Sequence, residues 1–134
     1  MDYIEEAVKV ARRSSIRTHK TGAIIVLGSK IISNGWSHVP EKPPQGLRSL
    51  HAEMHALARG RYRILRGATM YVVTISGKSG NIVNGRPCLH CAIALHGASL
   101  LCYHSIQHGI PNYQRFHYFD QLQHLKVYSE LNGD

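Results

Sequence analysis

Three residues in this chain have the side chains and the spacing of a metal site. Cys88 and Cys91 are separated by two residues in the segment Pro87-Cys88-Leu89-His90-Cys91, and His51 lies earlier in the chain. Two thiolates and one imidazole are ligands that suit zinc. Structural zinc sites have four protein ligands, so a set of three leaves one position open for water, as catalytic zinc sites do.

A carboxylate lies beside these candidate ligands in the sequence. Glu53 comes two residues after His51, which is near enough to move a proton without binding the metal. Zinc held by one histidine and two cysteines would lower the pKa of its bound water toward neutrality. The residues therefore predict a hydrolytic zinc enzyme in which Glu53 is the general acid and base.

A structural zinc site is the alternative interpretation of the same residues. His55, one helical turn after His51, or His90, inside the C-x-x-C segment, would then be the fourth ligand. Such a site gives Glu53 no role, so the catalytic interpretation is favoured. For His55 itself we expect packing or a hydrogen bond.

Helices and strands must bring these residues together. Asp2 with Glu5 forms a capping box, and apolar residues at helical spacing predict a helix to about Ile16. Next come a hairpin with strands at 21–27 and 30–36, a helix from Leu50 to Arg59 ended by Gly60, and a strand at 69–75. The last predicted elements are a projecting hairpin at 77–85, a helix at 88–98, a strand at 99–106, an aromatic-rich connection and a helix at about 118–131.

This order of elements favours an α/β fold. Strands that alternate with helices predict a mixed sheet covered by helices, and 134 residues are enough for a single domain over residues 1–134. His51 and Cys88 each fall at a predicted helix start. The positive ends of two helix dipoles would then face the metal and favour the ionised thiolates.

The two segments that hold these residues resemble those of a known enzyme family. His51-Ala52-Glu53 and Pro87-Cys88-Leu89-His90-Cys91 are similar to the H-x-E and P-C-x-x-C segments of the zinc-dependent cytidine, deoxycytidylate and tRNA-adenosine deaminases. The resemblance covers about residues 1–106 and implies a three-layer α/β/α deaminase-like fold. It also implies that His51, Cys88 and Cys91 bind Zn²⁺ and that Glu53 is catalytic.

The resemblance further implies a set of substrate contacts. Backbone groups near Ala52 and around Arg86 to Cys88 would hold the edge of the base, and His90 would line the pocket. Ser37, where relatives commonly have asparagine, lies in the turn that would grip the sugar, and Trp36 beside it would stack on a base. The expected substrate-binding residues are Ala52, Trp36, Ser37, Arg86, Pro87 and His90.

The charge of the chain favours a polyanionic substrate. Sixteen basic and eight acidic residues give a net charge of +8, and residues 7–115 hold fifteen of the basic residues but only two acidic ones. We therefore expect cytosine to be converted to uracil in single-stranded DNA or RNA. Free cytidine, deoxycytidine or deoxycytidylate is the alternative, favoured by the small size of the chain.

Two further alternatives are weaker. Relatives that act on tRNA adenosine usually carry glutamate before the Pro-Cys pair, and Arg86 occupies that position here. A zinc module that binds nucleic acid without catalysis would need no residue like Glu53.

The sequence also predicts an intracellular protein, cytoplasmic or nuclear. Cys88, Cys91 and Cys102 cannot all pair within one chain, and acidic Glu5 and Glu6 do not fit a signal peptide. No apolar run approaches the roughly 20 residues that cross a bilayer, so no membrane partner is expected. A homo-oligomer is expected from the resemblance.

Overall fold

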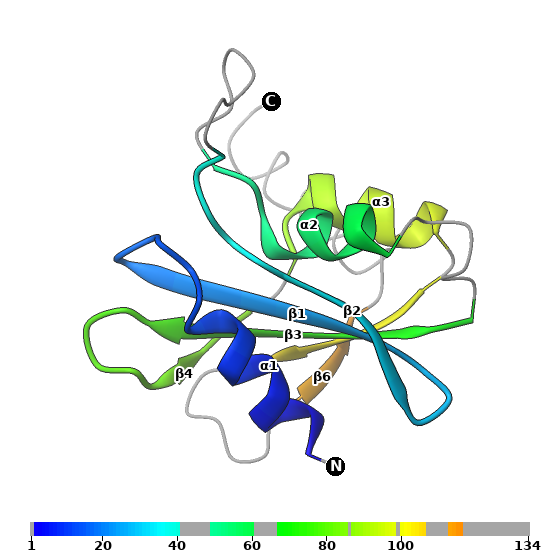
Figure 1. The fold of residues 1–134 in the computed structure, drawn as a ribbon, viewed down its shortest axis with the longest axis horizontal. Helices are drawn as coiled ribbons and strands as arrows, with labels where there is room; N and C mark the ends of the chain where they lie inside the picture. Colours follow the sequence, from blue (N-terminus) through cyan, green and yellow to red (C-terminus); the bar gives the residue numbers. More distant parts are fainter. Residues whose placement is uncertain are drawn as a thin grey trace, which may run out of the picture.

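The computed structural model describes residues 2–40, 49–60, 67–85, 87–98, 100–106 and 113–116. A mixed β-sheet with the strand order β2-β1-β3-β5-β6 forms its centre (Figure 1). The strands are β1 (His19–Leu27), β2 (Lys30–Trp36), β3 (Thr69–Ser76), β4 (Ile82–Val83), β5 (Leu101–Ser105) and β6 (Tyr113–Phe116). β3 and β5 are parallel, the other pairs are antiparallel, and the short β4 pairs with the end of β3.

Helices cover both faces of this sheet. α1 (Tyr3–Ala11) lies on one face, and α2 (Ala52–Arg59) and α3 (Leu89–Gly97) lie on the other (Figure 1). Successive residues of a strand point to opposite faces, so Ala23 and Ile25 of β1 pack with α2 and α3, whereas Ile24 and Val26 pack with α1. The expected three-layer α/β/α fold with a mixed sheet is confirmed.

Two glycines allow the helices to lie directly on the strands. A Cβ atom at Gly35 of β2 would lie 2.3 Å from the backbone nitrogen of Ala56 in α2. A Cβ atom at Gly22 of β1 would lie 2.3 Å from the backbone nitrogen of Ala11 in α1. The absence of a side chain at these positions therefore sets how closely α1 and α2 approach the sheet.

The first helix is shorter than the sequence predicts. α1 ends at Ala11 and not near Ile16, because the chain tightens as Arg13 and Ser14 donate backbone N–H bonds to the carbonyls three residues earlier. The Ser14 hydroxyl then accepts the N–H of Ile16, which a continuing helix would need for itself. The prediction was wrong here because this serine side chain competes with the helix backbone.

The remaining elements follow the expected order with one addition. β1 and β2 form the predicted hairpin, and β4 folds back on β3 where a projecting hairpin was expected. β6 pairs with β5 within the segment expected to be an aromatic-rich connection, so that expectation was wrong. The predicted helix at about 118–131 lies outside the described residues. None of the described helices has the length and apolar character of a membrane span.

Candidate metal and catalytic site

Two helix starts bring the three candidate ligands together. His51 is the N-cap residue of α2, Cys88 is the N-cap residue of α3, and Cys91 lies in the first turn of α3. The Nδ1 atom of His51 lies 3.5 Å from the Sγ atom of Cys88 and 3.4 Å from that of Cys91. The juxtaposition expected from the sequence is therefore present in the fold.

The spacing of these atoms fits a zinc ion. Zinc binds sulfur at about 2.3 Å and imidazole nitrogen at about 2.0–2.1 Å, so a tetrahedral site places nitrogen and sulfur about 3.6 Å apart. The three ligand atoms all lie within 4.8 Å of one another, and both nitrogen–sulfur distances agree with that value. This donor set belongs to zinc, with His51, Cys88 and Cys91 as the ligands that hold it.

The protons of the three ligands are coupled. Hydrogen bonds with Cys91 and His51 lower the pKa of the Cys88 thiol to about 3, and the bond with Cys88 raises the pKa of His51. The hydrogen bond between Cys88 and Cys91, together with burial, raises the pKa of the Cys91 thiol. Zinc needs deprotonated thiolates and a neutral imidazole, so binding releases protons and its affinity falls as the pH falls.

Glu53 lies in the first turn of α2, beside this group. The residue is only 4% exposed, and burial raises the pKa of its carboxyl group, while the nearby His51 opposes that shift. A carboxyl group whose pKa moves from its ordinary value toward neutrality suits general acid and base catalysis. The structure therefore places a buried carboxyl group with a raised pKa beside the ligands.

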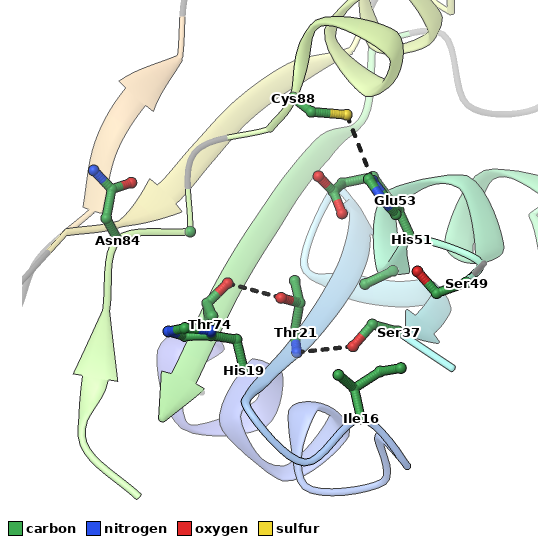
Figure 2. A pocket seen from close by; sticks show the side chains of 12 residues that line it. Ile16, His19, Thr21, Ser37, Ser49, His51, Glu53, Thr74, Asn84 and Cys88 are labelled. Atoms are coloured by element: carbon green, nitrogen blue, oxygen red, sulfur yellow. Dashed lines mark hydrogen bonds between the residues drawn. The ribbon is translucent and has the colours of Figure 1, made fainter. Parts of the chain in front are cut away.

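A cavity of about 260 Å³ opens beside the ligands and Glu53 (Figure 2). Its lining comes from the start of α2, the start of α3, strands β1 and β3 and the loops that follow α1, β2 and β4. The lining residues are Ile16, His19, Thr21, Ser37, Ser49, His51, Ala52, Glu53, Thr74, Asn84, Gly85 and Cys88.

The floor of this cavity continues the face that α2 and α3 cover. His19 and Thr21 share that face with Ala23 and Ile25 further along β1, and the face becomes polar where the helices begin. The hydroxyl groups of Thr21 and Thr74 lie 2.8 Å apart across β1 and β3 (Figure 2). The strands thus supply a hydrogen-bonding floor next to the metal ligands.

One wall of the cavity is held by paired serines. The Ser37 Oγ atom accepts the backbone N–H of Thr21 at 3.1 Å and lies 2.8 Å from the Oγ atom of Ser14. Ser14 is buried, with 3% of its surface exposed, and follows the end of α1. The loop after α1 therefore fixes the position of Ser37.

The expected substrate contacts are placed unevenly. Ser37 and Ala52 line the cavity. Trp36, Pro87 and His90 are not among the described lining residues, and Arg86 lies outside the described residues. The roles of all six in substrate binding stay predictions.

His55 has the bonded role expected of it. Its Nδ1 atom accepts the backbone N–H of Trp36 at 3.1 Å, and the rings of the two residues meet edge to face at 4.7 Å. His55 therefore anchors the end of β2 to α2, and it is not among the residues whose ligand atoms gather at the candidate metal site.

Seven lining residues were not identified from the sequence. They are Ile16, His19, Thr21, Ser49, Thr74, Asn84 and Gly85. The alternation along β1 and β3 carried a signal for His19, Thr21 and Thr74, because one face of each strand changes between polar and apolar residues at every second position. Ser49 and Asn84 lie in loops, where no periodic pattern indicates the direction of a side chain.

Comparison with known proteins agrees with this geometry. The family model described as "Cytidine and deoxycytidylate deaminase zinc-binding region" matches residues 1–101. No curated protein sequence matches the chain.

Several solved structures share the fold. The dCMP deaminase from the cyanophage S-TIM5 in apo form superposes with a TM-score of 0.65 at 22% identity, covering 92% of this chain and 88% of that chain. RibD from Acinetobacter baumannii gives a TM-score of 0.56 at 24% identity, covering 93% of this chain and 32% of that chain. Cytidine deaminase from Mycobacterium tuberculosis gives 0.52 at 19% identity, covering 86% and 90% of the two chains.

Proposed function

The chain belongs to the cytidine and deoxycytidylate deaminase family and is a zinc-dependent deaminase, and we propose that its substrate is cytosine carried in a single-stranded nucleic acid. The reaction replaces the amino group of the base with oxygen from water and releases ammonia. The observation that carries the catalytic assignment is the buried Glu53 in the wall of the cavity that also holds His51 and Cys88.

The chain's own residues supply the proton transfers and the position of the base. When bound, zinc lowers the pKa of a water molecule so that it becomes a nucleophile near neutral pH. Glu53 takes a proton from the attacking water, gives it to the ring nitrogen and later protonates the departing amino group. Burial of Glu53 suits this role, because a carboxyl group in a dry site keeps its proton more readily than one in water.

The preference for a polynucleotide is supported by charge. Among the described residues one ion pair is found, between Lys9 and Glu6, so most described basic side chains have no carboxylate partner. A field of one sign attracts polyanions, and single-stranded nucleic acid is the polyanion that carries cytosine.

Free deoxycytidylate is the second candidate substrate. The solved structure of the dCMP deaminase from cyanophage S-TIM5 shares the fold over most of both chains. The small cavity of about 260 Å³ is also compatible with a single nucleotide.

A competition experiment separates these substrates. The zinc-loaded protein is given one mixture of a cytosine-containing single-stranded oligonucleotide, cytidine, deoxycytidine and deoxycytidylate, and products are read by mass spectrometry. Deamination raises the mass by about one dalton. We expect this gain on the oligonucleotide. A gain on the small molecules alone would overturn the polynucleotide proposal and leave a nucleotide or nucleoside deaminase.

Glu53→Gln tests the catalytic assignment. The amide cannot carry the proton, so we expect turnover to fall by at least about 10²-fold while the protein still binds zinc, measured by metal content. The matched control is Glu5→Gln, which makes the same chemical change at an exposed position on α1. Retained turnover in Glu53→Gln would remove Glu53 from the reaction.

A further inference from the structure

Two arginines gather on one tryptophan at the edge of the sheet. The guanidinium carbon of Arg13 lies over the Trp36 ring at 5.2 Å from its centroid, and that of Arg59 lies over it at the same distance. Arg13 follows α1, Trp36 ends β2 and Arg59 ends α2. The fold therefore brings three separate segments together in one cationic cluster, which we call the Arg13–Trp36–Arg59 cluster.

The charges of this cluster are not neutralised within the described part of the chain. Both arginines are exposed, and no carboxylate there lies within ion-pair distance of either. Arg59 donates a hydrogen bond of 2.9 Å to the Oδ1 atom of Asn34, a neutral acceptor. Both guanidinium groups therefore keep positive charge that a phosphate group could neutralise.

The tryptophan beneath the two guanidinium groups is itself held in place. The backbone of Trp36 is bonded to His55, and its ring meets the His55 ring edge to face. A guanidinium stacked on an aromatic ring keeps its N–H donors in its own plane, where they can bind phosphate oxygens. Because the platform is fixed, little conformational entropy is lost when an anion binds.

The cluster is joined to the wall of the cavity. Ser37, the residue after Trp36, lines the cavity, and its Oγ atom lies 2.8 Å from that of Ser14, the residue after Arg13. Both Arg13 and Trp36 are thus one residue away from groups that form the wall. Trp36 also packs with the α1 face of the edge strand β2, so a strand whose cytosine occupies the cavity would have to pass around this edge to bring a neighbouring phosphate to the cluster.

We propose that Arg13 and Arg59, supported by Trp36, bind phosphodiester groups that flank the target cytosine in a single-stranded nucleic acid. The proposal rests on the proposed function, because it assumes that the cytosine in the cavity belongs to a chain. Trp36 is a positioning residue in this role, since its ring is in contact with the two cations.

The test measures binding of a single-stranded oligonucleotide with one cytosine over a range of salt concentrations. Each phosphate contact on a single strand contributes about 0.7 to the slope of log K against log salt. We expect Arg13→Gln and Arg59→Gln each to reduce that slope by about 0.7 and to lower kcat/KM for the oligonucleotide.

Lys30→Gln is the matched control. Lys30 is an exposed cation at the opposite end of β2, so its replacement removes the same charge without touching the cluster. Arg13→Lys and Arg59→Lys keep the charge, and they should keep the slope even if they pack less well on Trp36. Melting temperatures of all variants show which of them fold.

The outcomes separate this inference from the proposed function. If the wild type deaminates the oligonucleotide and the glutamine variants keep its salt slope, the cluster has no part in binding and the inference is overturned. If the wild type deaminates only free nucleosides or nucleotides, the proposed polynucleotide substrate is wrong and the inference fails with it. A slope that falls equally in Lys30→Gln would show general attraction without a phosphate site, which also overturns the inference.

Discussion

At the scale of single residues, His55 is held in a place where only its neutral form fits. Its Nδ1 atom accepts the N–H of Trp36, and a protonated imidazole cannot accept. Burial lowers the pKa of His55 below its ordinary value of 6.5, and the nearby His38 and Arg59 lower it further. The folded protein therefore binds this proton less readily than the unfolded chain.

This difference predicts a loss of stability in acid. The lowered pKa means that stability from His55 is fully present above pH 6.5 and is lost as the pH falls toward the folded pKa. His55→Gln keeps an acceptor for Trp36 but does not titrate. We expect the melting temperature of the wild type to fall more steeply than that of His55→Gln between pH 7 and about pH 5.

The control for this prediction is His96→Gln, which replaces an exposed histidine on α3. Its melting temperature should follow the pH dependence of the wild type. If the curve of His55→Gln runs parallel to the wild-type curve, the bond to Trp36 is not linked to a proton.

The metal ligands could be predicted from sequence because their chemistry is local. His51-x-Glu53 and Cys88-x-x-Cys91 each lie within one helical turn, so residue type and spacing predict most of their arrangement. The Arg13–Trp36–Arg59 cluster is different. Its members come from three elements that only the packed sheet brings together, and no spacing in the sequence indicates that meeting.

At the scale of elements, the approach of α2 to β2 decides where His51 and Glu53 lie. A Cβ atom at Gly35 would collide with backbone atoms of Ala56 and Ala52, which cannot rotate away as a side chain can. His51 is the N-cap residue of α2 and Glu53 lies in its first turn, so a shift of this helix moves both residues.

Gly35→Ala should therefore destabilise the protein and weaken zinc binding together. Overpacking of this kind costs about 1–3 kcal/mol, and more where backbone is involved. Denaturant unfolding and a zinc titration measure the two effects. The control is Gly28→Asn in the β1–β2 turn, where φ is +65° and an added Cβ atom would meet no other residue within 4 Å. Asparagine tolerates this φ, so the free energy of unfolding should hardly change. An unchanged stability in Gly35→Ala would show that α2 can move away without cost.

Element boundaries were predicted well where periodicity is strong and less well where side chains intervene. The β1–β2 hairpin follows directly from β-branched runs around Gly28. The end of α1 depends on Ser14, whose partner Ser37 lies far along the sequence. β6 forms because β5 offers it an edge, a tertiary effect that its own four residues do not indicate.

At the scale of the whole molecule, the zinc ligands connect two helices that pack on the same face. α2 supplies His51 and α3 supplies Cys88 and Cys91, so a bound ion links two elements that are separated by β3 and β4 in the sequence. An ion that binds the folded state and not the unfolded chain stabilises the fold.

Removal of zinc should lower the melting temperature of the protein. At a free zinc concentration 100 times the Kd, binding adds about 2.7 kcal/mol, which corresponds to a shift on the order of 10 °C for a chain of this size. Scanning calorimetry with a chelator, and again after zinc is restored, measures the shift. Glu53→Gln should show it and Cys88→Ala should not. An equal melting temperature with and without zinc would mean that the ion does not couple the two helices.

The serine pair beside the cavity has a consequence for what the wall can recognise. Ser14 and Ser37 have one hydroxyl proton each, and one of the two protons forms the hydrogen bond between their Oγ atoms. Ser14 is buried, and a buried hydroxyl proton without an acceptor is costly. Ser14 therefore donates to Ser37 in the arrangement that leaves no buried donor unpaired. The Ser37 oxygen then accepts from both Ser14 and the Thr21 N–H, which uses both of its lone pairs.

In this arrangement the Ser37 hydroxyl can donate one hydrogen bond to a substrate and has no lone pair left to accept one. The Ser37 hydroxyl can donate a hydrogen bond to a substrate oxygen in a free hydroxyl group, an ester link or a carbonyl group, because each has a lone pair. It cannot accept a hydrogen bond from a substrate N–H group. A Ser37 hydroxyl that contacts the sugar, as the sequence predicts, would therefore donate equally to a free hydroxyl group of a nucleoside and to an ester oxygen of a strand.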